Sequence, residues 1–220
     1  MRRLAQPQVM ISAAIAATLS AVLSLPRMLL WEDRPLPIWF PEVTILLCGF
    51  VLWAFVFAWH TEYTRRPVFT FKIKPAVFAA ATAAGIVIGI ALHFWLDPLI
   101  RPAAPKDFPP DLKHWAASTV FSLAFTQLFL LYAPFDWAIR LFRNETAALV
   151  MTVALGIVVL LLRNNAMPVQ LPASLLIALM GFKIAGIFFA VWFYLRGGIF
   201  LVWWLQLLLE ARHLLTYAGL

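Results

Sequence analysis

Long apolar stretches, separated by short polar segments rich in proline, dominate the hydrophobic pattern of this chain. A helix that crosses a membrane needs about 17–25 mostly apolar residues, because it rises about 1.5 Å per residue through about 30 Å of hydrocarbon. Seven stretches meet this requirement, so we expect an all-α, polytopic bundle of about seven transmembrane helices. They are residues 9–25, 43–59, 76–96, 115–135, 146–162, 171–195 and 199–215.

Proline and glycine are expected to mark the connections between these spans. The first connection is assigned Pro26, Pro35, Pro37 and Pro41, and the third is assigned the prolines from Pro98 to Pro110. Gly197 and Gly198 predict a very tight turn between the last two spans. We expect one integral membrane domain over residues 1–220, with three spans and their loops in 1–113 and a four-helix region in 114–220.

Composition narrows the class of protein. Hydrophobic residues make up 64% of the chain and charged residues only 12%. Soluble domains are about 45–50% apolar and about 25% charged, so a soluble enzyme, a disordered chain and a nucleic-acid binder are excluded. The lipid bilayer is the expected partner. The single cysteine, Cys48, excludes an internal disulfide and a cysteine-based metal site.

The net charge of +7 is explained by Lys and Arg residues that flank the spans. Nine of them fall on one side of the predicted topology and seven on the other. Positive residues favour the cytoplasmic side. We therefore predict a multi-pass protein of the cell inner (cytoplasmic) membrane, with its N-terminus in the cytoplasm.

Two of the ionisable residues inside the predicted spans stand out, because charge at membrane depth is costly and suggests a function. Lys183 precedes Arg196 by 13 residues, and Glu210 follows Gly197 by 13 residues. If the last two spans form a hairpin, both side chains lie at the same depth, and we expect a neutralising Lys–Glu pair. Three interpretations stay open: a structural ion pair, a proton path or catalytic carboxylate, and a Glu210 that is neutral or near water.

Polar side chains also form stripes at helical spacing. Gln206, Glu210 and His213 share one face of the last span, and Ser118, Ser122 and Thr126 share a face of the fourth, next to Gln127. We expect these stripes to face each other. The expected intramembrane polar network is Thr126, Gln127, Lys183, Gln206 and Glu210. It is either a hydrophilic site or a set of interhelical hydrogen bonds.

The third span carries small residues every fourth position, Ala81, Gly85 and Gly89, followed by His93. Such a line lets another helix approach closely. The alternative is that a tetrapyrrole pigment or haem lies there with His93 as its axial ligand. No cofactor and no metal site are otherwise predicted, because no strong metal-binding spacing occurs. His60 and His114 are expected to meet water or lipid headgroups at span ends.

Three stretches resemble the CPBP family of CAAX-processing and bacteriocin-processing (Abi-type) intramembrane proteases. They are LAFTQLFLLYAPFDWAIRLFRN, TAALVMTVALGIVVLLLRNN and FYLRGGIFLVWWLQLLLEARHLL, which are similar to the family's motif helices in kind and order. The resemblance implies a CPBP-like fold for the C-terminal half. It also implies a site of glutamate and histidine residues that activates water, directly or through a metal.

The positions that match this site carry other residues. They are Thr126 and Gln127, Leu131 or Tyr132, Asn164 or Asn165, Gln206 and Glu210. Glutamine cannot act as a general base, and threonine cannot replace a carboxylate at neutral pH. The resemblance therefore implies a bacterial pseudoprotease without catalytic residues.

We expect a non-catalytic, CPBP-like structural or assembly subunit of a larger membrane complex, with partner membrane proteins. One alternative is an unusual intramembrane hydrolase or protease that uses Glu210 and His213. Another is a small transporter or proton-conducting protein that uses Lys183 and Glu210.

Overall fold

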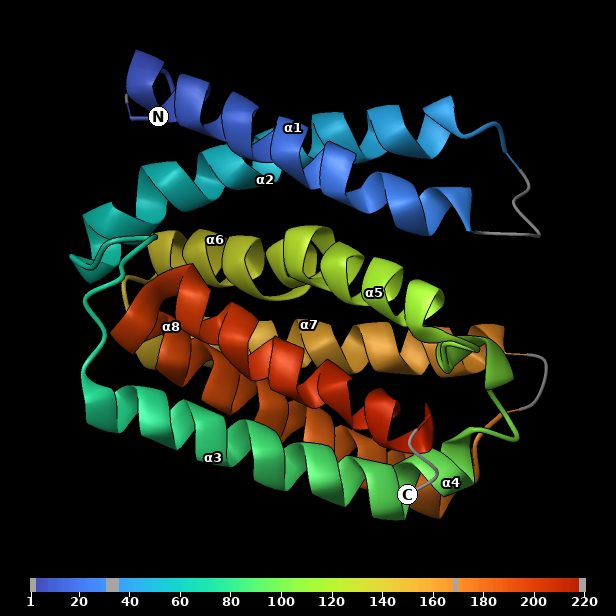
Figure 1. Cartoon of the computed structure of the whole chain (residues 1–220). Coiled ribbons are helices and arrows are strands. Elements are labelled where there is room, and N and C mark those ends of the chain that lie inside the picture. The colour runs from blue at the N-terminus through green and yellow to red at the C-terminus, as the bar shows by residue number, and fades with distance from the viewer. Residues whose placement is uncertain (1–2, 31–35, 168–169, 218–220) are drawn as a thin grey trace. The chain divides into compact units, whose positions relative to one another are not determined.

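The computed structural model describes residues 3–30, 36–167 and 170–217, and all regular structure in these ranges is helical (Figure 1). The elements are α1 (Pro7–Leu29), α2 (Trp39–Thr64), α3 (Pro75–Ala91), η1 (Leu92–Leu96), α4 (Asp97–Ile100), η2 (Pro105–Asp107), α5 (Leu112–Phe121), η3 (Ser122–Thr126), η4 (Leu128–Tyr132), α6 (Ala133–Phe142), α7 (Glu145–Ala166) and α8 (Ala173–Tyr217). The predicted all-α class is confirmed. Three residues used in the sequence predictions lie outside the described residues. They are Pro35 of the first connection, and Arg2 and Arg34, which were counted among the positive residues on the two sides of the membrane.

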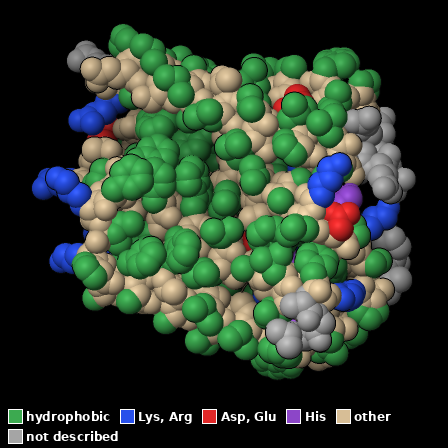
Figure 2. All heavy atoms as spheres, viewed as in Figure 1, with side chains coloured by type: hydrophobic (Ala, Val, Ile, Leu, Met, Phe, Trp, Pro, Cys, Tyr) green, Lys and Arg blue, Asp and Glu red, His purple; other side chains and the backbone are tan. Residues whose placement is uncertain are grey.

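Six helical segments within the described ranges are long and apolar enough to cross a membrane. The first five predicted spans each lie inside one of these segments, and the last two share α8. Hydrophobic side chains are spread across the whole face shown in Figure 2. The chain thus has the helices of a multi-pass membrane protein, because such a surface is stable against lipid and not against water.

Helix α8 reverses its direction at Gly198, where φ is 63° and ψ is −162°. That backbone conformation is open to glycine and essentially to no other residue. The first arm is residues 173–197 and the second arm is residues 199–217. They run antiparallel, because the end of the segment Pro75–Ile100 meets the start of the first arm and the end of the second. Leu96 packs against Leu175, and the next residue, Asp97, pairs with Arg212 (Figure 1).

Several helix ends follow from local residue chemistry. Helices α2 and α6 both end at an arginine in the left-handed conformation, Arg65 with φ 58° and Arg143 with φ 51°. Each arginine places its positive charge at the negative end of a helix dipole. Asp111 and Asn144 begin α5 and α7, because their side-chain oxygens accept the backbone N–H groups of His114 and Ala147 at 2.8 and 3.0 Å.

Three prolines assigned to connections lie inside helices instead. Pro26 is within α1, Pro41 is in the first turn of α2, and Pro98 is the second residue of α4. A first-turn proline loses no hydrogen bond, since its N–H has no partner in the helix. Pro26 comes near the end of α1, and the helix continues past it through Arg27 and Met28 to Leu29. The expected breaks at these residues were wrong.

The chain divides into two compact units: one formed by Met1–Val68 and Ala116–Ala148, the other by Phe69–Trp115 and Leu149–Leu220. The units alternate along the chain, and the predicted division into residues 1–113 and 114–220 stays a prediction. In the first unit, Trp53 Nε1 donates to Ser20 Oγ at 3.0 Å, and that hydroxyl donates to the carbonyl of Ala124 at 3.0 Å. These bonds join α2, α1 and η3.

In the second unit, α3 packs closely against the second arm of α8. A Cβ atom added at Gly85 would lie 2.8 Å from Leu208 Cβ, and one at Gly89 would lie 3.4 Å from the Leu208 carbonyl oxygen. Trp204 adds an indole hydrogen bond of 2.9 Å to Thr82. The small residues of α3 therefore form a helix-packing seam.

Candidate functional site

A buried ion pair anchors a polar cluster at one end of the second unit. Arg212 Nε donates to Asp97 Oδ2 at 3.0 Å, with 18% and 6% of the two side chains exposed. Arg212 Nη1 also donates to the Leu209 carbonyl at 2.8 Å. The pair neutralises a carboxylate at the α4 end of the third span and ties it to α8. This pair was not predicted, because Asp97 falls just outside the predicted span of residues 76–96.

The stripe on the second arm of α8 is present as predicted. Gln206 Nε2 donates to Glu210 Oε1 at 2.7 Å, and His213 Nε2 lies 3.8 Å from Glu210 Oε2. Trp115 donates its indole N–H to the Glu210 carbonyl at 2.8 Å. The carboxylate and the imidazole are adjacent but beyond hydrogen-bonding distance, so no proton passes directly between them in this arrangement.

Lys183 is not part of this cluster. No ion pair joins Lys183 to Glu210 among the residues the structure describes. Its side chain lies toward α7, where a Cβ added at Gly156 would be 3.4 Å from Lys183 Cε. The expected pair was wrong because equal spacing from a turn fixes the depth of two residues and not the direction in which each faces around its helix axis.

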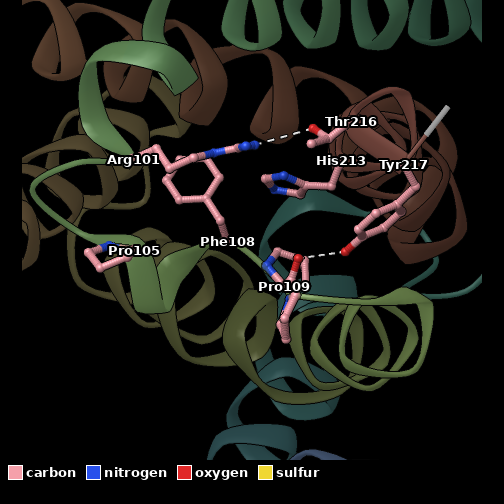
Figure 3. A pocket seen from close by; sticks show the side chains of 8 residues that line it. Arg101, Pro105, Phe108, Pro109, His213, Thr216 and Tyr217 are labelled. Carbon is pink, nitrogen blue, oxygen red and sulfur yellow. Dashed lines mark hydrogen bonds between the residues drawn. The ribbon is translucent and has the colours of Figure 1, made fainter. Parts of the chain in front are cut away.

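A hollow of about 330 Å³ opens beside the cluster (Figure 3). Arg101, Phe108, His213, Thr216 and Tyr217 line it. Arg101 Nη2 donates to Thr216 Oγ1 at 3.3 Å, and the Tyr217 hydroxyl donates to the Pro109 carbonyl at 2.6 Å. The Phe108 ring meets the His213 ring edge-on, with centroids 5.6 Å apart. The loop of residues 101–110 and the end of α8 are therefore held together around the hollow.

A second hollow of about 350 Å³ shares Arg101 and Thr216 with the first. His93, Phe94, Asp97 and Pro98 complete its lining. His93 is 9% exposed and stands in η1, directly after the packing seam. Because Leu208 occupies the seam at Gly85 and Gly89, the small residues serve helix packing. Ligation of a macrocycle by His93 stays a prediction, tested by visible absorbance that disappears in His93→Ala.

Thr126 and Gln127 lie in the first unit, in η3 and directly after it. The other members of the predicted network, Lys183, Gln206 and Glu210, belong to the second unit. Of these three, the structure joins Gln206 and Glu210. A network that includes residues of both units stays a prediction.

The first unit holds a buried pair that the sequence analysis missed. His60 Nδ1 lies 2.9 Å from Asp136 Oδ1, and both side chains are fully buried. The expectation that His60 meets water or headgroups was wrong, because α2 extends past it to Thr64 and α6 packs against α2. A signal was present: Asp136 is surrounded by apolar residues on both sides, as a buried acid in a helix would be.

One position matched to the family's catalytic residues has a structural role. Asn164, 6% exposed, accepts the Leu171 N–H on its side-chain oxygen at 3.0 Å and so joins the end of α7 to the chain before α8. Within the described ranges, no three His, Cys, Asp or Glu residues gather as a metal site would need.

Outside the spans, the pKa of Asp111 is lowered, mainly because the backbone N–H of His114 donates to its carboxylate. The His114 side chain, 2.8 Å from the same oxygen, lowers the pKa further. Asp111 thus stays ionised as the cap of α5.

No protein-family model, no curated protein and no solved structure matches this chain.

Proposed function

We propose that this protein is a non-catalytic, CPBP-like integral membrane protein that acts as a structural or assembly subunit of a larger membrane complex. One observation carries the proposal: polar groups inside the helical segments bond to other parts of the fold. Ser20, Trp53 and Trp204 bond across helices, and Gln206 occupies one oxygen of Glu210. The bonds across helices hold those helices together, and a carboxylate oxygen that accepts from Gln206 is poorly placed to activate water.

The proposal includes seven membrane crossings, with the N-terminus in the cytoplasm of a bacterial cell. The arms of α8, residues 173–197 and 199–217, would be about 37 and 28 Å long at the usual helical rise, which suits one crossing each. Contacts within each unit agree with the side of the membrane proposed for each connection. Arg66, after the second span, pairs with Glu145, after the fourth, at 2.9 Å. Phe71, before the third span, stacks on Phe200, just after the α8 turn. All four residues would lie on the cytoplasmic side.

Contact with partner proteins is tested by photo-crosslinking. A photoreactive residue at Phe71, which is 83% exposed, or at Val87, which is 65% exposed, should crosslink to the same partner in native membranes. The same residue at Tyr194, which is 1% exposed, serves as the buried control. Extraction of the native membranes with a mild detergent should purify this protein together with that partner. If both exposed sites give only lipid adducts, the subunit proposal fails.

A hydrolase is the second candidate, favoured by the 3.8 Å separation of Glu210 and His213 and by the hollow that His213 lines. Proteolysis of co-expressed membrane substrates is the test. We expect no cleavage by the wild type. Cleavage by the wild type that is lost in Glu210→Gln would establish the hydrolase and remove the non-catalytic proposal.

A further inference from the structure

Arg101 is an exposed residue that lines both hollows. Its guanidinium lies 4.9 Å from the centroid of the Phe108 ring and donates to Thr216. Among the residues the structure describes, Arg101 forms no ion pair. A guanidinium has five N–H donors, and this one uses a single donor within the described fold. A cation with unused donors at the edge of two hollows is suited to bind an anion.

Two carboxylates near the hollows already have partners, and a third, Glu210, accepts a hydrogen bond from Gln206. Asp97, which lines the second hollow, is paired with Arg212, and Asp111 accepts both the backbone and the ring N–H of His114 at its helix cap. An anion in the hollows therefore meets the charge of Arg101 with little competition from acidic side chains of the protein. The Thr216 hydroxyl and the His213 ring lie beside Arg101 (Figure 3).

The depth of the site identifies the kind of anion. Arg101 directly follows the segment Pro75–Ile100, and Tyr217 is the last residue of Ala173–Tyr217, both long and apolar enough to cross a membrane. Lipid headgroups lie at the ends of such segments. The second hollow continues from Arg101 to Phe94, which is 64% exposed, and to Pro98. An acyl chain attached to a bound headgroup would meet these apolar side chains.

We propose that the two hollows bind a phospholipid with an anionic phosphate headgroup, with Arg101 as the cation for the phosphate and Phe94 and Pro98 against the chain. The full-length protein in phosphatidylcholine bilayers with and without phosphatidic acid provides the test. Native mass spectrometry counts the phosphatidic acid that each variant retains. Arg101→Gln should lower retention about tenfold, the effect of losing a charged hydrogen-bonded contact.

Arg196→Gln is the matched control. Arg196 also lies over an aromatic ring, 3.9 Å from the Trp192 centroid, but it belongs to neither lining. The control should retain phosphatidic acid like the wild type. Arg101→Lys keeps the charge without the planar fork, so retention should lie between wild type and Arg101→Gln. It also tests the site if Arg101→Gln does not fold.

Phe94→Ala separates a lipid from a small phosphate ion. It should reduce retention of phosphatidic acid, and inorganic phosphate should not displace the lipid from the wild type, because the ion makes no chain contacts. Equal losses in Arg101→Gln and Arg196→Gln would overturn the site. Displacement by inorganic phosphate, together with no effect of Phe94→Ala, would overturn the lipid assignment.

Discussion

Buried polar pairs join helices within each unit. His60 and Asp136 meet at 2.9 Å with both side chains fully buried, so this contact ties α2 to α6. A buried charge is stable only while its partner is in place. Arg212 and Asp97 play the same part in the second unit.

The His60–Asp136 pair gives the first prediction. Asp136→Ala should lower the free energy of unfolding by about 3–5 kcal/mol, since it removes a buried carboxylate from contact with the imidazole. Replacing both residues with leucine should cost much less, because no polar group is then buried. Unfolding in detergent, followed by circular dichroism, measures both. A double variant as unstable as Asp136→Ala would contradict the pairing.

The helix cap at Asp111 gives a prediction on pH. The folded pKa of Asp111 lies below its unfolded value, so its contribution to stability is present above the unfolded pKa and is lost as pH falls through the folded pKa. Asp111→Asn keeps an acceptor for the His114 N–H but does not titrate there. When unfolding is measured as a function of pH, the wild type should therefore lose more stability at acid pH than the variant does. Matching curves would contradict the cap.

At the scale of helices, the glycines of α8 differ in what they permit. Gly198→Ala should destabilise the protein by about 1–3 kcal/mol, because alanine does not adopt that backbone conformation without strain. Gly197→Ala should also destabilise, since its Cβ would lie 2.7 Å from Leu201 Cβ. Thermal unfolding in detergent compares them with Gly181→Ala and Gly186→Ala, where nothing lies within 4 Å of the added atom.

Those two controls should be neutral or slightly stabilising, by up to about 1 kcal/mol, because alanine favours a helix more than glycine does. Similar losses at Gly181, Gly186 and Gly198 would mean that glycine serves α8 generally and not its reversal. Such a result would remove the hairpin as the reason for the Gly197–Gly198 pair.

The approximate positions of the spans could be predicted from the sequence because each needs a long apolar run. The turn at Gly197 and Gly198 could be predicted for a similar reason, since glycine is required there. The π-helical segments η1, η3 and η4 carry no local signal, and the directions of Lys183 and His60 depend on which helices become neighbours. The hollows around Arg101 combine a loop with two helix ends far apart in sequence, so no motif shows them.

For the whole molecule, the arrangement of loops predicts sidedness. Reporter fusions after Arg66 and after Lys106 should report opposite sides of the membrane, because the segment Pro75–Ile100 lies between them. A fusion after Arg143 should agree with Arg66, since Arg66 pairs with the nearby Glu145. Reporter activity in intact cells measures this. The same side for Arg66 and Lys106 would contradict the topology.

The wide turns η3 and η4 determine where the fourth span tolerates a change of length. A π turn holds about one residue more than an α turn, so deleting one residue within 122–126 or 128–132 would restore α geometry there and leave the helix beyond it in the same angular position. Deleting one residue within 133–135 has a different effect, because that stretch is already α-helical and each residue advances an α-helix by about 100°. Asp136 would then leave the face that meets His60. The loss of one residue is thus absorbed at one place in the helix and breaks the buried pair at another, with both partners still present in the sequence.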